Sequence, residues 1–143
     1  MFRLALICAL LTLYGCHNQQ SAELRDFAQA FRQANQADEI EPMLALYALN
    51  GSTEQTVNLL KSALLNELGM PISQIEFEAL TGSPEETIHY THNGIEYGPT
   101  IQPLMRMRVS YATEDKFESL YSIGKNDADH WRIVSSRPIR PNL

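Results

Sequence analysis

The sequence predicts an α+β domain in which three helices come first and an antiparallel sheet follows. Two observations carry this prediction. Between residues 21 and 68, apolar residues recur at the spacing of one helix face. After Pro71, apolar and polar residues alternate, which is typical of strands that bury one face. Because the helices are grouped before the strands, we expect them to pack on one face of the sheet.

The first two helices are defined by their ends. The first is expected to begin at Ser21, a good N-cap, and to end near Asn35. The second is short, has Pro42 at its first position, and is closed by Asn50-Gly51. Their expected buried residues are Leu24, Phe27, Ala28 and Phe31 in the first helix and Met43, Leu44 and Tyr47 in the second.

Residues 52–68 give the clearest helix. Ser52 to Gln55 resembles a capping box, and Gly69 followed by Pro71 ends the helix. The expected apolar stripe consists of Val57, Leu60, Leu64 and Leu68, widened by Leu59 and Ala63.

The strand region divides into stretches separated by turn signals. Asn93-Gly94 is a strong hairpin signal, and residues 126–129 are expected to form another turn. The tail from Pro138 onward is too rich in proline to be expected in the sheet. The predicted strands are residues 74–79, 87–92, 95–97, 104–111, 117–123 and 131–133, the last with Trp131 in the core.

One face of the predicted sheet is charged. If the strands that carry these charges are neighbours in the sheet, acidic and basic side chains on this face form cross-strand pairs, each contributing about 0.2–1 kcal/mol. Glu76 and Glu78 lie side by side on it, whereas the two carboxylates of a glycosidase face each other across a cleft. We therefore interpret them as partners of arginines. The charged residues are Glu76, Glu78, Arg106, Arg108, Glu118 and Arg132.

The first fifteen residues have the pattern of a signal peptide. Arg3 supplies a positive charge, and an uncharged apolar run follows from residue 4 to residue 14. A membrane-spanning helix needs roughly twenty residues, so this run is too short for one.

Leu13-Tyr14-Gly15-Cys16 resembles the lipobox of bacterial lipoproteins. The resemblance implies a lipid on Cys16 and removal of residues 1–15, while Tyr14 departs from the small residue usual at its position. His17 after the cysteine implies an outer-membrane destination. Because Cys8 leaves with the signal, the mature chain has no free thiol.

The remaining chain is large enough for one domain. We expect a lipidated tether at residues 16–20, a domain at 21–138 and a short tail at 139–143. Extended, residues 17–20 would reach roughly 15 Å. The formal net charge of −6 argues against nucleic acid and against electrostatic adhesion to anionic lipid. The expected membrane contact is therefore the lipid anchor alone.

Three helices, the third of them long, followed by a sheet that ends in a hairpin resemble the nuclear transport factor 2-like (SnoaL-like) superfamily. The resemblance covers residues 21–138 and is carried by Phe27-x-x-x-Phe31, the third helix, and the ending from Ile123 to Val134. It implies a cystatin-like cone, in which the helices pack on a strongly bent antiparallel sheet around a cavity. Members of the superfamily include isomerases, dehydratases and ligand carriers, so the fold does not choose a function.

Candidate site residues are few. His89 and His92 point to opposite faces of a strand, so a metal site is not expected there, although one of them could be a cavity base. The sequence has no phosphate loop, dinucleotide fingerprint or serine nucleophile elbow, and we expect no cofactor. Tyrosines suit pocket linings because they join an apolar ring to a polar tip. The candidate pocket residues are Tyr47, His89, Tyr90, Tyr97 and Tyr111.

Three kinds of function stay open at this point. The favoured one is an envelope lipoprotein facing the periplasm that binds a small apolar ligand or an envelope protein without catalysis. The second is an acid–base isomerase or dehydratase that uses the cone cavity. The third is a dimeric structural or assembly module. The protein is expected to be a monomer or a homodimer.

Overall fold

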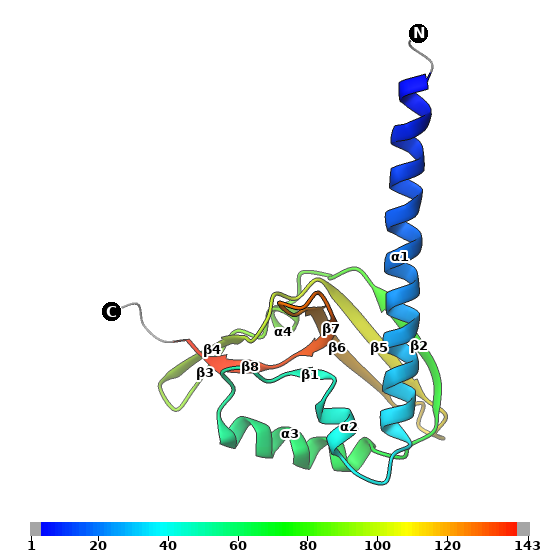
Figure 1. The fold of residues 1–143 in the computed structure, drawn as a ribbon. Helices are drawn as coiled ribbons and strands as arrows, with labels where there is room; N and C mark the ends of the chain where they lie inside the picture. The colour runs from blue at the N-terminus through cyan, green and yellow to red at the C-terminus, as the bar shows by residue number, and fades with distance from the viewer. Residues whose placement is uncertain (1–3, 140–143) are drawn as a thin grey trace.

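The structure, a computed structural model, describes residues 4–139 of the chain and, of their side chains, those from residue 19 onward. It is an α+β fold with two sheets, as Figure 1 shows. The helices are α1 (Leu4–Asn35), α2 (Glu41–Leu44), α3 (Glu54–Glu67) and α4 (Pro84–Thr87). The strands are β1 (Tyr47–Ala48), β2 (Ile72–Glu78), β3 (Tyr90–His92), β4 (Ile95–Pro99), β5 (Met105–Tyr111), β6 (Glu118–Lys125), β7 (Trp131–Val134) and β8 (Ser136–Pro138).

The larger sheet has five strands in the order β1-β7-β6-β5-β2. Its pairs are antiparallel except β1 with β7, which makes the sheet mixed. This sheet is not strongly curled, so the expected strongly bent cone is wrong. The predicted strands at 87–92 and 95–97 instead contribute β3 and β4 to a separate sheet of three strands, in the order β3-β4-β8, whose third strand was not predicted.

The smaller sheet extends to one side of the molecule (Figure 1). Its β3–β4 hairpin turns at Asn93 and Gly94, both with positive φ, which confirms the hairpin signal. Pro138 does belong to a strand, against our expectation, because it pairs with Tyr97 at the edge of this sheet. An edge position tolerates a residue that lacks an N–H donor.

Helix α1 is longer than the sequence signals indicate. It is already helical at Ser21, so this residue is not its N-cap, and residues 17–20 are helical where an extended tether was expected. Contacts with the sheet favour the helix here: the Glu23 carboxylate lies 2.8 Å from Lys125 Nζ, and Gln20 Nε2 lies 3.9 Å from Met105 Sδ. Within the described residues, no helix is both long enough and apolar enough to cross a membrane.

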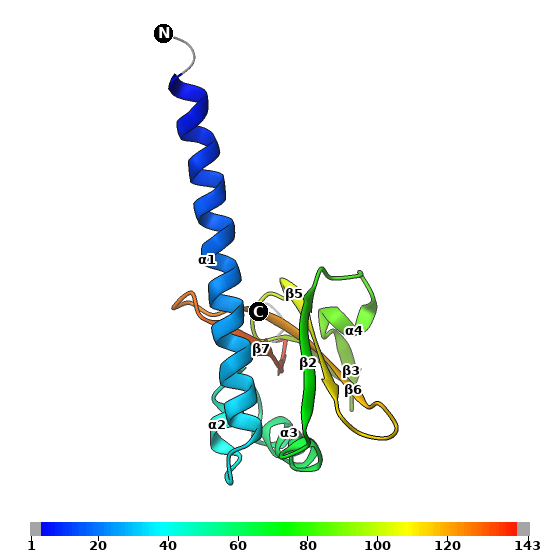
Figure 2. The same ribbon diagram turned by 90° about the vertical axis from the view of Figure 1, so that its right-hand side faces the viewer.

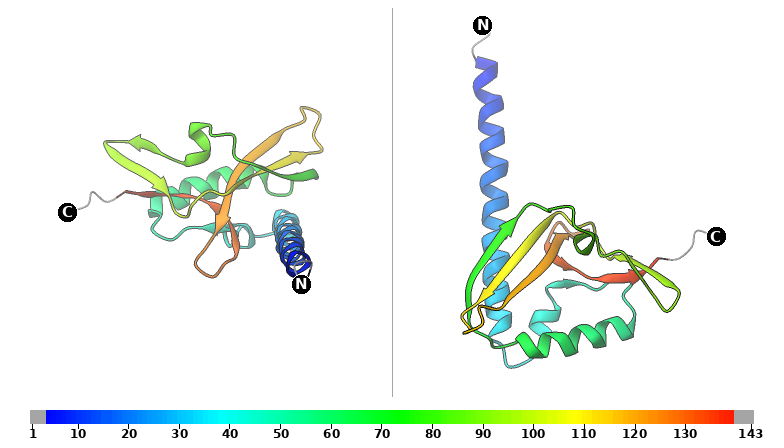
Figure 3. Two further views of the ribbon diagram at one scale, coloured as in Figure 1. Left: turned by 90° about the horizontal axis from the view of Figure 1, so that it is seen from above. Right: turned by 180° about the vertical axis from the view of Figure 1, so that it is seen from behind.

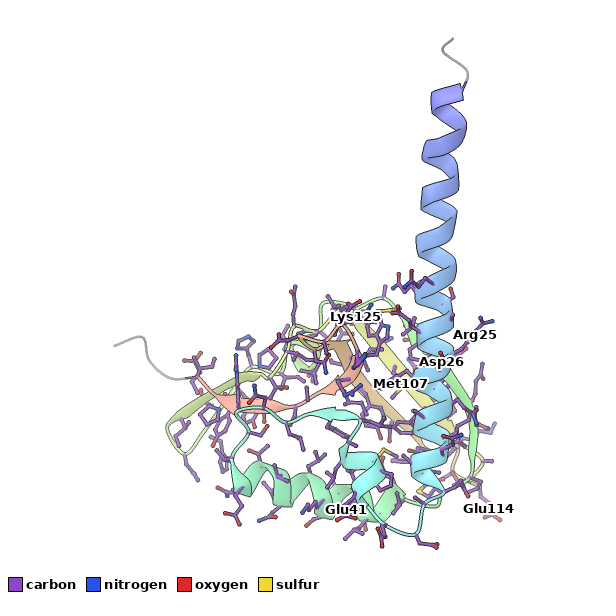
Figure 4. All side chains as sticks on the ribbon, viewed as in Figure 1. Arg25, Asp26, Glu41, Met107, Glu114 and Lys125 are labelled. Carbon is purple, nitrogen blue, oxygen red and sulfur yellow. The ribbon has the colours of Figure 1, made fainter. Side chains whose placement is uncertain are left out.

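The core lies between α1, α3 and the inner face of the larger sheet. Phe31 is 1% exposed and lies with its ring 5.6 Å from that of Tyr121, and Met107 is fully buried (Figure 4). Leu24, Phe27 and Leu64 are also buried, together with Ala34 and Met43, which confirms the main apolar stripes. The predicted widening of the third stripe is wrong at both of its residues, because the sheet contacts only one side of α3: Leu59 is 65% exposed and Ala63 is also exposed.

Two predicted helix boundaries, the start of α3 and the end of α2, differ from the structure by one or more residues. Thr53, not Ser52, is the N-cap of α3, and its side chain accepts from Thr56 N. The Ser52 hydroxyl instead donates to Ser136 O at 2.7 Å. Tyr47, expected on the buried side of the second helix, lies in β1, because α2 ends at Leu44 and the chain then pairs with β7.

Helix α4 was not expected from the sequence, and it lies on the outer face of the larger sheet. Figure 2 shows α1 and α4 on opposite sides of this sheet, so the expectation that all helices share one face is wrong. A start signal for α4 is present, since Ser83 precedes Pro84 and two acidic residues follow. The predicted strand at 87–92 is therefore shortened to residues 90–92.

Candidate binding groove

The first half of β6 has one uncovered edge. Strand β7 pairs with β6 only at Ile123–Lys125. After Val134 the chain bends away toward the smaller sheet, where Thr100 N donates to Ser135 O at 2.9 Å. The views in Figure 3 show the β5–β6 hairpin running past the end of β7. Among the residues that the structure describes, no strand therefore pairs with the edge of β6 before Ile123.

A groove of about 490 Å³ lies along this edge. Its inner wall includes Tyr47 and Leu60, and its outer wall consists of α4 and the residues next to it. The volume falls within the usual range for ligand sites, roughly 300–1,000 Å³. The lining residues are Tyr47, Leu60, Ser83, Glu85, Glu86, Ile88, Arg106, Leu120, Tyr121, Ser122, Ile133 and Val134.

The outer wall of the groove is fixed by Glu86, which is 6% exposed. Its carboxylate accepts from the backbone N–H groups of Thr81 and Gly82, each at 2.8 Å, and from Arg106 at 3.5 Å. The bonds from Thr81, first of all its backbone N–H, hold the pKa of Glu86 below its usual value. In addition, the Ser122 hydroxyl donates to Glu86 O at 2.9 Å, which joins α4 to β6. Glu86 thus serves as an anionic anchor of the wall.

An ion-pair network covers the outer face of the sheet behind this wall. Glu78 on β2 accepts from both Arg106 and Arg108 on β5, and Arg108 Nη1 lies 2.7 Å from Glu118 on β6. This confirms the pairing of Glu78 with arginines, because β2 and β6 both lie next to β5, whereas Glu76 accepts from Gln74 instead. Hydrogen bonds from Arg108 and then Arg106 lower the pKa of Glu78 from 4.5 to about 2.

The lowered pKa of Glu78 predicts a specific pH dependence of stability. Because the folded pKa is depressed, Glu78 stabilises the fold above pH 4.5, and this contribution is lost as pH falls toward 2. We expect Glu78→Gln to flatten the dependence of the free energy of unfolding on pH in that window, as measured by urea titrations at several pH values. Glu76→Gln, two positions along the same strand, is the matched control and should leave the dependence unchanged. Equal pH profiles for the two variants would contradict the prediction.

Beneath the groove, Glu67 at the end of α3 gathers three hydroxyl groups. Tyr121 donates to it at 2.7 Å, Ser119 at 3.1 Å and Tyr111 at 3.4 Å. Burial, followed by the charge of Glu67, raises the pKa of Tyr111 to about 12. Burial also raises the pKa of Tyr47 and of Tyr121 well above the ordinary value. The ring of Tyr121 is therefore held in the groove wall by a protonated hydroxyl bonded to a carboxylate.

The candidate pocket residues do not come together. Only Tyr47 lines the groove, while Tyr111 lies in the Glu67 cluster. Tyr90 and Tyr97 stack in the smaller sheet with ring centroids 4.9 Å apart. His89 lines a different depression, of about 510 Å³, beside Thr100 and Arg137.

Sequence reasoning missed Tyr121, Leu120 and α4 as parts of the groove. Tyr121 and Leu120 look like ordinary members of an alternating strand, and nothing local indicates that β7 stops short of them. The Ser-Pro-Glu-Glu start of α4 was the one signal available. The proposed lipidation site, Cys16, has its side chain outside the described part of the chain.

Two further features concern acidic, asparagine and histidine residues. Among the described side chains, those from residue 19 to residue 139, no group of three or more histidine, cysteine or acidic residues could hold a metal ion. Residues 126–129 form a turn, as predicted, in which Asn126 Oδ1 accepts from the backbone N–H groups of Ala128 and His130.

Comparisons with known proteins do not add to this geometry. No family model matches the chain, and no curated protein or solved structure matches it. The groove and the N-terminal sequence are therefore the features that bear on function.

Proposed function

We propose that this protein is an envelope lipoprotein, anchored through Cys16, whose domain binds a partner molecule in the β6 groove without catalysis. The observation that carries the proposal is the groove itself: an open, largely apolar channel beside an uncovered strand edge, with walls fixed by hydrogen bonds. The partner is a small apolar ligand or a segment of another envelope protein.

The course of α1 supports a short anchor. Gln19, Gln20 and Glu23 lie beside Met105 and Lys125, at the end of the sheet from which the first part of α1 projects (Figures 1 and 4). Cys16 precedes Gln19 by one helical turn, about 5 Å along the axis. Acyl chains on Cys16 would therefore hold the domain close to the membrane, on the periplasmic side. His17 supports the outer membrane as the destination.

The polar groups of the groove favour binding over acid–base chemistry. Glu86 is engaged by backbone donors, and the Tyr121 hydroxyl is bonded to Glu67. A catalytic acid or base needs a titratable group that faces the substrate and is free to exchange a proton. The two groups instead stabilise the walls, which suits a site that recognises shape and apolar surface.

We also propose a distant relation to the nuclear transport factor 2-like superfamily. The order of helices and strands and the closing β6–β7 hairpin support it. The larger sheet is not strongly curled, and the groove lies at an open strand edge, whereas the superfamily's pattern implies an enclosed cone.

Occupancy of the groove tests this proposal. The mature chain, purified from the envelope of its own host, is expected to carry a bound molecule in native mass spectrometry. Leu120 is 53% exposed and lines the groove, so Leu120→Lys should place a charge in the channel and lower occupancy at least tenfold. Leu59→Lys is the matched control, because Leu59 is 65% exposed and lies outside the groove. An empty protein, or equal loss in both variants, would contradict the proposal.

A further inference from the structure

We propose that the occupant of the groove is an extended peptide segment of a partner protein, which pairs with β6 as an additional strand. This inference rests on the proposed binding function and narrows it to one class of partner. Its basis is the direction of the backbone groups of Leu120, the path of β7, and the two different walls of the groove.

The backbone N–H and C=O of Leu120 point into the groove. Tyr111 N donates to Phe117 O at 3.0 Å, so the backbone groups of Phe117 face β5. In a strand of regular register these groups alternate between the two edges, and Leu120 is three positions farther along. Leu120 therefore faces away from β5, and among the described residues its backbone has no partner strand on that side.

The space beside Leu120 has the position of a missing strand. Ile133 pairs with Ile123, so an antiparallel continuation of β7 would run past Ser122 toward Glu118. The chain instead leaves this line after Val134 to form β8. The space that a continued β7 would occupy beside β6 would hold a strand of about five residues, at roughly 3.4 Å per residue and about 4.8 Å from β6. Val134 marks one end of this line, and it also lines the groove.

The two walls predict the side-chain pattern of the peptide. Side chains on its inner face would meet Tyr47 and Leu60, so apolar residues are expected there. Side chains on its outer face would meet Ser83, Glu86 and Arg106, so polar residues are expected at the alternate positions. A peptide that alternates apolar and polar residues fits both walls, as in other cases of strand addition to a sheet edge.

The edge itself carries few of the features that discourage pairing. Natural edge strands are commonly blunted by lysine, proline or a bulge. The segment Glu118–Ser122 contains no lysine or proline, its register with β5 is regular, and the exposed side chain at its centre is Leu120. Such an edge is available for pairing. Because Tyr47 and α4 lie on the two walls of the groove, only one added strand fits between them.

Hydrogen exchange of the Leu120 amide tests the inference. The probes are acetylated and amidated heptapeptides in which threonine alternates with valine, leucine or phenylalanine, with a lysine at each end for solubility. We expect NMR-detected exchange of the Leu120 N–H in the wild-type protein to slow at least tenfold on addition of the best of these peptides. The Tyr121 N–H, which faces β5, is the internal control and should not change.

The matched control peptide carries N-methyl groups on alternate residues, which removes the donors that would pair with β6 and keeps the side chains. It should leave the Leu120 exchange rate unchanged. If no peptide slows this exchange while the protein from its host still carries a small molecule in the groove, the inference is wrong and the proposed binding function stands. If peptides protect other amides, or the methylated peptide protects Leu120 equally, the inference is also wrong. If the groove is empty in the native protein as well, both proposals fail.

Discussion

Gly124→Ala is expected to lower the free energy of unfolding by about 3 kcal/mol, at the upper end of the usual cost of overpacking. Gly124 lies in β6, and a Cβ placed on it would be 2.2 Å from the backbone oxygen of Gln102. That oxygen has little freedom to retreat, because the next residues are tied to β6 through the bond from Leu104 N to Ile123 O at 2.8 Å. Urea unfolding, followed by the fluorescence of Trp131, measures the effect.

Gly69→Ala is the control for this substitution. In contrast to Gly124, no atom lies within 4 Å of a Cβ placed on Gly69, so an added methyl group meets no steric obstacle there. Its φ of +83° disfavours alanine, so a cost of roughly 1 kcal/mol is expected. If Gly124→Ala lowered the free energy of unfolding no more than Gly69→Ala does, the close approach of Gln102 O to Gly124 would be contradicted.

Cys16→Ser is expected to move the protein from the membrane fraction to the soluble fraction almost completely. Serine lacks the thiol that accepts the lipid, and each buried methylene of an acyl chain contributes about 0.8 kcal/mol to membrane binding. The negative net charge offers no electrostatic attraction to replace it. Fractionation of host cells followed by immunoblotting measures the change.

Cys8→Ser is the matched control for the anchor. Cys8 lies within the proposed signal peptide and takes no part in lipid attachment, so this variant should stay in the membrane fraction. Retention of Cys16→Ser in the membrane would show that something other than the lipid on Cys16 holds the protein there.

The sequence allowed good predictions where the physical cause is local. Alternating residues predicted β2, β5, β6 and β7, because one face of each strand must be apolar to pack on α1 and α3. The pairing of Glu78 with arginines was predictable because these residues lie on the polar face of alternating strands, although it also required the assumption that their strands are neighbours in the sheet. The Asn93-Gly94 turn was predictable because few residues other than glycine and asparagine accept positive φ.

The groove could not be predicted because its causes are not local. It exists because β7 stops pairing with β6 at Ile123, and the chain then bends to form β8, which pairs in the smaller sheet. The division into two sheets also separates Tyr90 and Tyr97, which lie in the smaller sheet, from Tyr47, which lies in β1 of the larger sheet. The N-terminal limit of α1 was also missed, because contacts of Gln20 and Glu23 with the sheet favour helix before the expected cap at Ser21.

The most direct test of membrane anchoring is the intact mass of the protein extracted with detergent from its host's membranes. We expect a chain that begins at Cys16 and carries the added mass of a diacylglyceryl group, with a further acyl chain on the new amino terminus. A mass that corresponds to the chain from Met1, or to an unmodified Cys16, would contradict the proposal that this protein is a lipoprotein.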